Sequence, residues 1–193
     1  KKKFKNIKVY NQSKNRGVSA CRNKGIKKAK GSFLFFLDSD DFILKNCITK
    51  LIKSINNNLD SDLIIAKKFV VLSWKNKFLT HEVFKKRFNK KKSNQLIGEL
   101  SKEKNIYGQI YNYIINKKFL IKNKIQFVFG ANFAEDQEFV IRLLCFGKKF
   151  SFYNNPYYCH SAGAGNLTNV MTINSGLSCL MVANSLSYLL KIK

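Results

Sequence analysis

Apolar runs and helical repeats alternate along the chain. A continuous apolar run at 32–37 ends abruptly at Asp38, and a second run covers 62–66. Their length and their aromatic and β-branched content are typical of strands buried on both faces, as in a parallel sheet. Further strands or extended segments are predicted at 7–10, 68–79 and 149–153.

Segments with helical spacing separate these strands. The pattern predicts helices at 18–30, 46–56, 95–122 (with a break near Gly108), 134–146 and 177–190. Residues 161–174 are rich in Gly, Asn, Ser and Thr, which predicts a loop. Strands that alternate with helices indicate a layered α/β fold. Ligands of such folds bind beyond the carboxyl ends of the strands, and this rule points to Asp38.

The composition suits a single globular domain with a strongly basic surface. The 193 residues are 45% hydrophobic, and 36 basic against 11 acidic residues give a net charge of +25. Only four of the basic residues are arginine, and the lysines are spread along nearly the whole chain, with small clusters at 1–3 and 90–92. We interpret them as lysines on solvated faces, as an AT-rich genome would encode. The alternative is attraction to anionic lipid or nucleic acid, although nucleic-acid binders usually concentrate their basic residues on one face.

Neither the cysteines nor the apolar segments indicate secretion. The five cysteines form no CxxC pair, which argues against a disulfide framework and a zinc ribbon. The apolar segment 177–190 is shorter than the ~20 residues of a membrane span, and no apolar signal core follows the charged start of the chain. We expect a cytoplasmic protein. We expect segment 177–190 to pack on the domain core. The alternative is peripheral contact of this segment and of the basic surface with the inner face of an anionic membrane.

The scarce acidic residues gather at two places. Asp38, Asp40 and Asp41 directly follow the first apolar run, where like charges are costly without a counter-ion. Asp38 and Asp40 are spaced so that both can approach one Mg²⁺ or Mn²⁺ ion, which prefer oxygen ligands. The alternative is a solvated turn in which Asp41 caps a helix.

The second acidic pair, Glu135 and Asp136, stands at the start of the helix predicted at 134–146. Acidic residues favour the first turn of a helix, so a structural role explains the pair. The functional interpretation is a general base aimed into a cleft.

A longer motif surrounds the first acidic cluster. Residues 15–42 read NRGVSACRNKGIKKAKGSFLFFLDSDDF, which closely resembles the nucleotide-sugar-binding region of glycosyltransferase family 2, the GT-A-fold transferases. That region commonly shows N-x-G-x-x-x-A-R-N-x-G-I, then A-x-G, a hydrophobic strand and D-x-D-D. The matching residues are Asn15, Gly17, Arg22, Asn23, Gly25, Ala29, Gly31, Asp38, Asp40 and Asp41, with Cys21 in place of the usual alanine.

The later part of the chain is similar to the acceptor side of the same family. The pairs Tyr111-Asn112, Phe119-Leu120 and Glu135-Asp136 stand where W-N-K, F-L and E-D motifs are usual, although Tyr113 replaces the lysine. Residues 154–168 resemble the terminal segment, with His160 where arginine is more usual. His160 then either closes the metal site, as a histidine does in some GT-A enzymes, or is a surface or core histidine.

The resemblance implies roles on the donor side. Asp38 would contact the nucleotide and help to hold the metal, and Asp40 would ligate the metal against the diphosphate. Arg16, Gly17 and Arg22 would support the nucleotide side, with a structural role as the alternative for Arg22.

On the acceptor side, the resemblance implies that Asp136 deprotonates a hydroxyl, with Glu135 as its neighbour or substitute. In-line attack by that hydroxyl would invert the anomeric centre. We therefore expect a metal-dependent bacterial glycosyltransferase that uses a nucleotide-diphospho-sugar, UDP-linked, and a surface-glycan or lipid-linked glycan acceptor such as capsule or lipopolysaccharide. The competing hypotheses are an inactive remnant or interaction protein and a basic nucleic-acid-binding module.

The resemblance also predicts the domain layout. We expect a GT-A domain at 1–168, with a mixed sheet flanked by helices, and a helical extension at 169–193. The family pattern opens with a βαβ unit that has no counterpart here, so we predict an N-terminally incomplete domain. The strand at 32–37 would then expose an unpaired edge, and we expect this chain alone to be poorly stable, with little or no transferase activity.

Overall fold

The computed structural model describes residues 6–73, 75, 77–83, 109–161 and 172–191. In chain order its elements are α1 (Gly17–Lys28), β1 (Phe33–Leu34), β2 (Phe42–Ile43), α2 (Ile48–Asn56), β3 (Leu63–Ala66), β4 (Lys68–Leu72), β5 (Phe78–Glu82), η1 (Ile110–Asn112), β6 (Tyr113–Asn116), α4 (Lys117–Lys122), α5 (Glu135–Phe146), β7 (Phe150–Tyr153), β8 (Tyr158–Ser161) and α6 (Ile173–Lys191).

The first sheet forms the core, in the order β1-β6-β3-β7. Its second-to-last strand, β3, pairs antiparallel with β6, where Ile64 lies opposite Ile114, and parallel with β7, where Ile64 lies opposite Ser151. All four residues of β3 are buried, as are the first three of β6. The sheet is therefore mixed, and its centre is apolar on both faces.

The second sheet positions the acidic turn. Its order is β2-β8-β4-β5, with antiparallel pairing of β2 to β8 and of β4 to β5, and parallel pairing of β4 to β8. Strand β2 begins one residue after Asp41, and its Phe42 lies opposite Cys159 of β8. This pairing fixes residues 38–41 against the end of β8.

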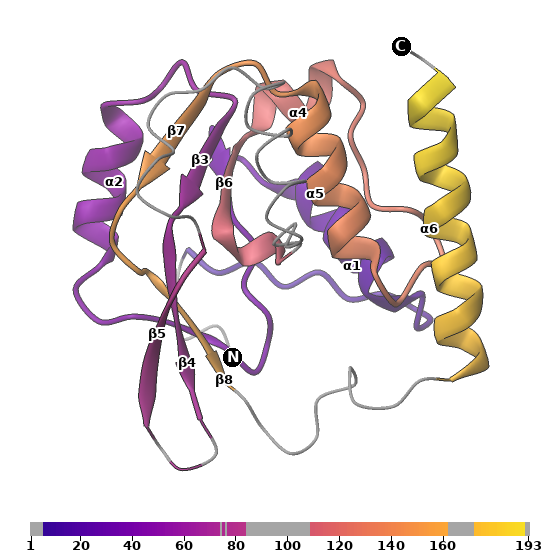
Figure 1. Ribbon diagram of the computed structural model, residues 1–193, viewed down its shortest axis with the longest axis horizontal. Helices are drawn as coiled ribbons and strands as arrows, with labels where there is room; N and C mark the ends of the chain where they lie inside the picture. Colours follow the sequence, from indigo (N-terminus) through magenta and orange to yellow (C-terminus); the bar gives the residue numbers. More distant parts are fainter. Residues whose placement is uncertain (1–5, 74, 76, 84–108, 162–171, 192–193) are drawn as a thin grey trace.

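Helices flank the core sheet on both sides. Figure 1 shows α2 on one side of β3 and β7, α5 and α1 on the other, and α6 outermost beyond α5. Phe127 and Phe139 stack with their ring centroids 3.9 Å apart, and Phe36 meets both rings edge-on. These aromatic contacts pack α5 and the segment that follows α4 against the apolar run after β1.

Most predicted elements are confirmed. The helices expected at 18–30, 46–56, 134–146 and 177–190 are α1, α2, α5 and the longer α6, and the strands expected at 62–66 and 149–153 are β3 and β7. The extended segment at 68–79 is the hairpin strand β4 and the start of β5. The pattern did not predict β2 or β8, which are two and four residues long.

Two predictions of regular structure were wrong. Residues 113–116, expected in a helix, form β6, because the run Tyr113, Ile114, Ile115 is paired on both sides by β1 and β3. The rest of that expected helix is α4 at 117–122, while 95–108 lies outside the described residues. Residues 7–10 form no strand, and Val9 is exposed.

The apolar run at 32–37 differs most from its expectation. Only Phe33 and Leu34 form a strand, and they pair antiparallel with β6, so this part of the sheet is not parallel. Phe35 and Leu37 are exposed, which contradicts the expected burial on both faces. Strand β1 lies at the edge of its sheet, as predicted, and within the described residues it pairs with β6 alone.

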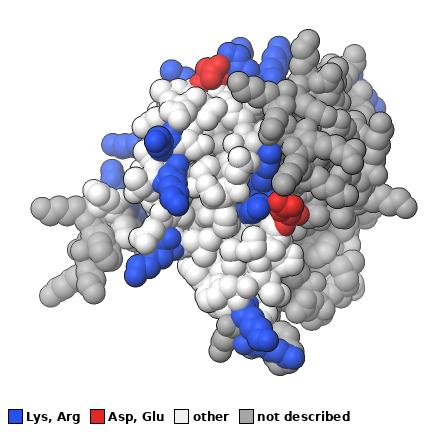
Figure 2. Space-filling model, turned by 60° about the vertical axis from the view of Figure 1, so that its left-hand side comes forward, with Lys and Arg blue, Asp and Glu red and all other residues white. Residues whose placement is uncertain are grey.

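On one face of the molecule, the basic side chains are as scattered as they are along the sequence. On the face that Figure 2 shows, Lys and Arg side chains stand at separate places instead of gathering over one element. The lysine clusters at 1–3 and 90–92 lie outside the described residues. Among the described residues, no helix has the length and hydropathy that a membrane span requires.

Candidate active site

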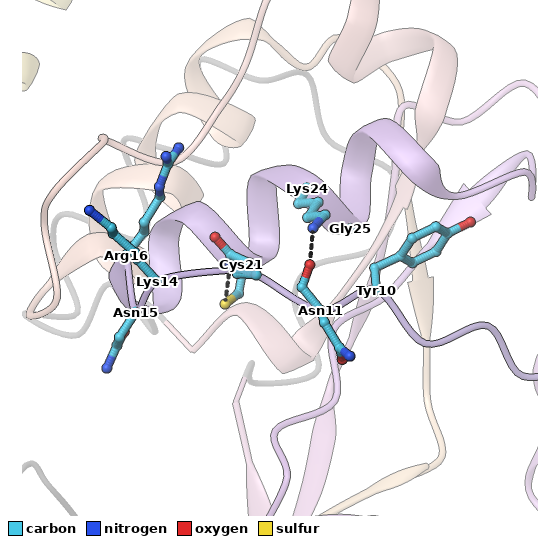
Figure 3. A pocket seen from close by; sticks show the side chains of 9 residues that line it. Tyr10, Asn11, Lys14, Asn15, Arg16, Cys21, Lys24 and Gly25 are labelled. Carbon is cyan, nitrogen blue, oxygen red and sulfur yellow. Dashed lines mark hydrogen bonds between the residues drawn. The ribbon is translucent and has the colours of Figure 1, made fainter. Parts of the chain in front are cut away.

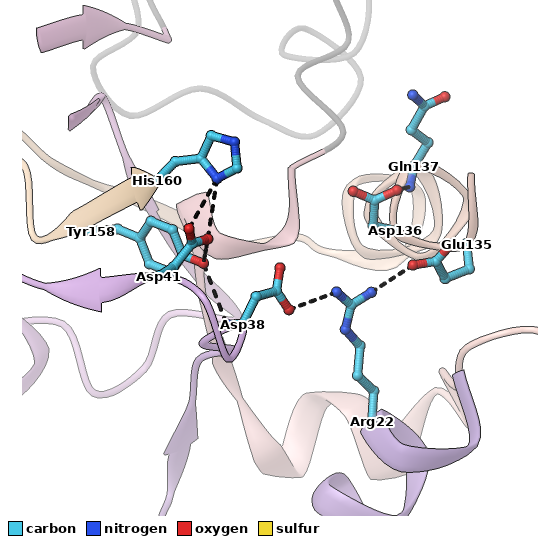
Figure 4. A network of polar contacts seen from close by, with 8 residues as sticks. All are labelled: Arg22, Asp38, Asp41, Glu135, Asp136, Gln137, Tyr158 and His160. Atoms are coloured by element: carbon cyan, nitrogen blue, oxygen red, sulfur yellow. Dashed lines mark hydrogen bonds and ion pairs between the residues drawn. The ribbon is translucent and has the colours of Figure 1, made fainter. Parts of the chain in front are cut away.

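Four segments that are distant in the sequence meet around Arg22 (Figure 4): α1, the turn at 38–41, the start of α5 and β8. The Arg22 guanidinium lies between two carboxylates, with Nη2 2.9 Å from Oδ1 of Asp38 and Nη1 2.8 Å from Oε1 of Glu135. Its burial lowers the pKa of Arg22, but the hydrogen bond and charge of Asp38 and the charge of Glu135 outweigh this effect and raise the pKa overall. Arg22 is therefore a fixed cation that joins α1, the acidic turn and α5.

Local contacts of α1 hold Arg22 in this position. One turn before it, the Ser19 hydroxyl donates a hydrogen bond to the backbone oxygen of Ala131. Next to it, the Asn23 side chain donates to the backbone oxygen of Phe127 and accepts from the backbone N–H of the same residue, each at 2.9 Å. The Phe127 ring lies under the guanidinium, 5.3 Å from its centre. The motif residues of α1 thus serve to orient Arg22.

Asp41 anchors the acidic turn. Its side chain is only 1% exposed and accepts hydrogen bonds from the Tyr158 hydroxyl, from the backbone N–H of Ser161 at 2.8 Å and from Nδ1 of His160 at 3.1 Å. The expected role of Asp41 as a helix cap was wrong, because strand β2 follows it and α2 begins only at Ile48. With its oxygens engaged in this way, Asp41 fixes the turn and does not face solvent.

Asp38 and Asp40 remain open to solvent on the same turn. The Asp38 side chain is 41% exposed although one of its oxygens pairs with Arg22, and Asp40 is exposed. Within the described residues, Asp40 has no hydrogen bond or ion pair, and no group of three or more His, Cys, Asp or Glu side chains is arranged to hold a metal ion. Two exposed carboxylates two residues apart fit an Mg²⁺ or Mn²⁺ ion whose remaining ligands come from a substrate.

Aromatic side chains from β8 and η1 form one wall of the site. Tyr111 and Tyr158 stack with their ring centroids 4.3 Å apart, and His160 lies beyond, 6.1 Å from Tyr111. Burial, together with the charges of Asp41, Asp136 and Asp38, raises the pKa of Tyr111. Burial and the hydrogen bond to Asp41 likewise raise the pKa of Tyr158, so both hydroxyls stay protonated.

The two acidic residues of α5 differ in their surroundings. Ala134, in the left-handed conformation (φ 58°), precedes the helix and directs its first turn toward the site. Glu135 is buried and ion-paired with Arg22. Asp136 points from α5 toward Asp38 and His160 (Figure 4), and burial, followed by the charge of Glu135, raises its pKa to about 6. Asp136 is therefore an ionisable carboxylate that is poised to accept a proton near neutral pH.

Arg16 and Gly17 lie at the other end of the α1 motif. Arg16 is exposed and lines a cavity of about 550 Å³ between residues 10–16 and the outer side of α1, together with Cys21 and Lys24 (Figure 3). Within the described residues, no hydrogen bond or ion pair joins Arg16 to the carboxylates of the site. Gly17 has a φ of +78° and packs against the Asn132 side chain, which leaves no room for a Cβ atom.

The structure therefore brings together most of the residues that the sequence singled out. Hydrogen bonds and ion pairs join Asp38, Arg22, Glu135 and His160 in one network through Asp41 and Tyr158, and Asp136 faces this network from α5. Arg16 and Gly17 lie outside it. Sequence reasoning assigned no role to Tyr158 and no anchoring role to Asp41. Tyr158 belongs to the Pro-Tyr-Tyr segment before His160, but nothing in that pattern indicates which carboxylate it meets.

Comparison with known proteins identifies the family. The family described as "Glycosyl transferase family 2" matches residues 1–134. Among curated relatives, poly(ribitol-phosphate) beta-N-acetylglucosaminyltransferase TarP of Staphylococcus aureus is 30% identical over 175 residues, which are 90% of this chain and 51% of TarP. Cholesterol galactosyltransferase of Borreliella burgdorferi is 25% identical over 179 residues, 89% of this chain and 49% of that relative. The chain thus spans about half the length of these relatives.

Solved structures agree on the fold. The crystal structure of S. aureus TarS 1–349 in complex with UDP-GlcNAc matches with a TM-score of 0.71 at 22% identity, over 93% of this chain and 50% of TarS. This likeness confirms the expected GT-A architecture with its mixed sheet and flanking helices. Together with the match over residues 1–134, it shows that the chain belongs to glycosyl transferase family 2.

Proposed function

We propose that this site transfers a sugar from a UDP-sugar to a hydroxyl of a glycan acceptor, with inversion at the anomeric carbon. The observation that carries the proposal is that two kinds of carboxylate lie on either side of Arg22. The side chain of Asp38 is 41% exposed on the acidic turn, and desolvation raises the pKa of the half-buried Asp136 on α5. The UDP-GlcNAc and UDP in solved TarS structures support a UDP-linked donor.

The donor side consists of the acidic turn and its supports. Asp38 and Asp40 would hold Mg²⁺ or Mn²⁺ together with diphosphate oxygens, and the metal would neutralise the charge that develops on the leaving diphosphate. Arg22 orients Asp38 through its ion pair. His160 is a further candidate ligand through Nε2, because Nδ1 faces the buried carboxylate of Asp41, the arrangement that orients many metal-bound histidines.

The acceptor side consists of the start of α5. Asp136 would take the proton of the attacking hydroxyl, and with a pKa of about 6 it is ionised at neutral pH yet more basic than an ordinary Asp. Glu135 is held by Arg22, so we assign it the positioning of that cation, with proton transfer as its secondary role. Arg16 and Gly17 would contact the nucleotide from the start of α1.

The wider biology follows as part of the same proposal. We propose a cytoplasmic bacterial enzyme that acts on a cell-surface or lipid-linked glycan, with a catalytic domain at 1–168 and a helical extension at 169–193. The similarity to TarP, a poly(ribitol-phosphate) beta-N-acetylglucosaminyltransferase, supports a polymer as the acceptor class. The scattered lysines of Figure 2 give no support to sequence-specific nucleic-acid binding.

Calorimetry with UDP in the presence and absence of Mn²⁺ tests the proposal on the wild-type chain, Asp40→Ala and Asp60→Ala. Asp60 is the matched control, because it is an exposed Asp whose side chain pairs with Lys149. It lies just before β3, at the end of the sheet opposite to the acidic turn. We expect Mn²⁺-dependent binding by the wild type and Asp60→Ala, and a loss of about tenfold or more in Asp40→Ala. A folded wild-type chain that does not bind UDP would indicate a remnant without a working donor site.

A further inference from the structure

The outward side of α6 carries a stripe of exposed apolar side chains. Ile173, Leu177, Leu180 and Tyr188 recur at the spacing of one helix side, and Leu180 is 68% exposed. From Ile173 to Tyr188 the stripe extends for about 22 Å. Its first half, up to Met181, is apolar, and the exposed polar residues Asn184 and Ser187 separate it from Tyr188. Exposed apolar side chains grouped in this way are typical of an interaction site.

The rest of the domain covers only the other side of α6. There, Val182 and Leu189 are buried, and the Ser185 hydroxyl joins Arg142 and the buried Glu138 of α5. This polar contact fixes the rotation of α6, so the exposed stripe faces away from α5. Figure 1 shows α6 as the outermost helix. The predicted packing of this helix on the domain core is therefore confirmed for one side alone.

The segment before α5 extends the apolar surface. Phe129 is 68% exposed, its neighbour Gly130 lies against the Met181 side chain, and the backbone N–H of Asn132 donates a hydrogen bond to Ser178. Phe129 therefore lies beside α6. We call Ile173, Leu177, Leu180, Met181, Tyr188 and Phe129 the α6 patch.

The net charge of the chain discriminates between possible partners of the α6 patch. No acidic residue follows Glu138 in the sequence, and the chain as a whole carries a net charge of +25. Two copies of such a chain repel each other, whereas an anionic lipid surface attracts it. At the end of the stripe, Nζ of Lys191 lies 5.6 Å from the centre of the Tyr188 ring. An aromatic ring beside a lysine is typical of the interface between membrane and water.

We propose that the α6 patch docks on the surface of an anionic lipid bilayer, with α6 lying in the plane of the interface. The apolar stripe would enter the boundary between headgroups and acyl chains, and Lys191 would stay at the level of the phosphates. The proposal is independent of the transferase function, because the α6 patch shares no residue with the site around Arg22.

Flotation with phosphatidylcholine vesicles, with and without phosphatidylglycerol, tests the proposal. We expect the wild type to float only with vesicles that contain phosphatidylglycerol, and Leu177→Asn with Leu180→Asn to weaken this binding about tenfold or more. The control is Ile52→Asn with Leu59→Asn, which removes two equally exposed apolar side chains in and just after α2, on the opposite side of the molecule. It should bind like the wild type.

Any of three results would overturn the proposal. The first is a wild type that does not bind vesicles containing phosphatidylglycerol. The second is an equal loss of vesicle binding in both double variants, and the third is a Leu177→Asn with Leu180→Asn variant that binds like the wild type. Circular dichroism melts establish that each variant is folded. The competing hypothesis is that a second copy of the chain binds the α6 patch, and analytical ultracentrifugation without lipid tests it. A wild-type dimer that becomes monomeric in the Leu177→Asn with Leu180→Asn variant would make the α6 patch an interface between two copies.

Discussion

The acidic turn and the first turn of α5 present carboxylates to the same arginine, yet their environments differ. On the turn, Asp38 is 41% exposed and Asp40 is exposed, while on α5 Glu135 is buried and burial raises the pKa of Asp136 to about 6. Exposed carboxylates suit a hydrated cation and a diphosphate, whereas a desolvated carboxylate suits proton transfer. The comparison shows how the surroundings of a carboxylate can suit it to one of the two roles that we propose for this site.

A second contrast lies within the turn itself. Asp38 and Asp41 are three residues apart, but Asp41 is 1% exposed and engaged by Tyr158, Ser161 and His160. One aspartate therefore holds the turn in place so that the others can remain accessible. The variants below separate these roles, from the largest expected effect to the smallest.

Replacement of the proposed base gives the largest effect. Asp136→Asn keeps an oxygen that can accept the backbone N–H of Gln137 but removes the proton acceptor. In a protein that releases UDP from a UDP-sugar, either this chain or a longer chain that contains it, we expect the rate of UDP release to fall by about 100-fold or more. The control is Gln137→Ala, whose exposed side chain points away from the site (Figure 4). Equal losses in both variants would remove Asp136 from the role of base.

Removal of the shared cation tests whether the two acidic segments depend on each other. Arg22→Met leaves Glu135 buried without its partner, so we expect the free energy of unfolding in urea to fall by about 3 kcal/mol. Lys68→Met breaks the exposed ion pair with Glu82 and should cost about 0.5 kcal/mol or less. Similar losses in both variants would mean that Arg22 is not a structural link between the segments.

The pH dependence of stability reports on Asp136 directly. The folded chain holds the Asp136 proton more tightly than the unfolded chain, because burial raises the pKa from 3.8 to about 6. The wild type should therefore lose stability relative to Asp136→Asn as the pH rises from about 4 through 6, by roughly 1–2 kcal/mol. Urea unfolding of both proteins across this range measures the difference, and parallel curves would show that the pKa is not raised.

The smallest effect concerns the anchor of the turn. Tyr158→Phe removes the hydroxyl that donates to Asp41, while Ser161 and His160 continue to engage this carboxylate. We expect a loss of about 1 kcal/mol in stability and weaker UDP binding, since the turn that carries Asp38 and Asp40 loosens. Tyr188→Phe, on the exposed side of α6, should change neither quantity.

The sequence predicted which acidic segments meet better than it predicted the contacts that support them. The D-S-D-D and E-D motifs stand out because acidic residues are scarce, and the structure joins Asp38 of the first and Glu135 of the second through Arg22. The partnership of Asp41 with Tyr158 was not predictable from the pattern, because it depends on the pairing of the two-residue strand β2 with β8. Strands this short leave no period in the sequence.

The predicted secondary structure has the same limit, because local spacing does not contain the partners that a strand meets in the fold. Long periodic helices such as α5 and α6 were predicted, whereas β6 was assigned to a helix together with α4, which directly follows it in the sequence. Its strand conformation is set by partners on both sides, β1 and β3, which local spacing does not contain. The apolar run before Asp38 was expected to be buried, but it lies at the sheet edge, where Phe35 and Leu37 remain exposed.

The division of roles between the two acidic segments is the central claim, and the affinity of Asp136→Asn for UDP in the presence of Mn²⁺ tests it most directly. Calorimetry should give this variant an affinity within about threefold of the wild type, because Asp38 and Asp40 are intact, although its transfer rate is lost. If Asp136→Asn instead loses UDP binding to the same extent as Asp40→Ala, both segments belong to one binding unit and the assigned roles are wrong.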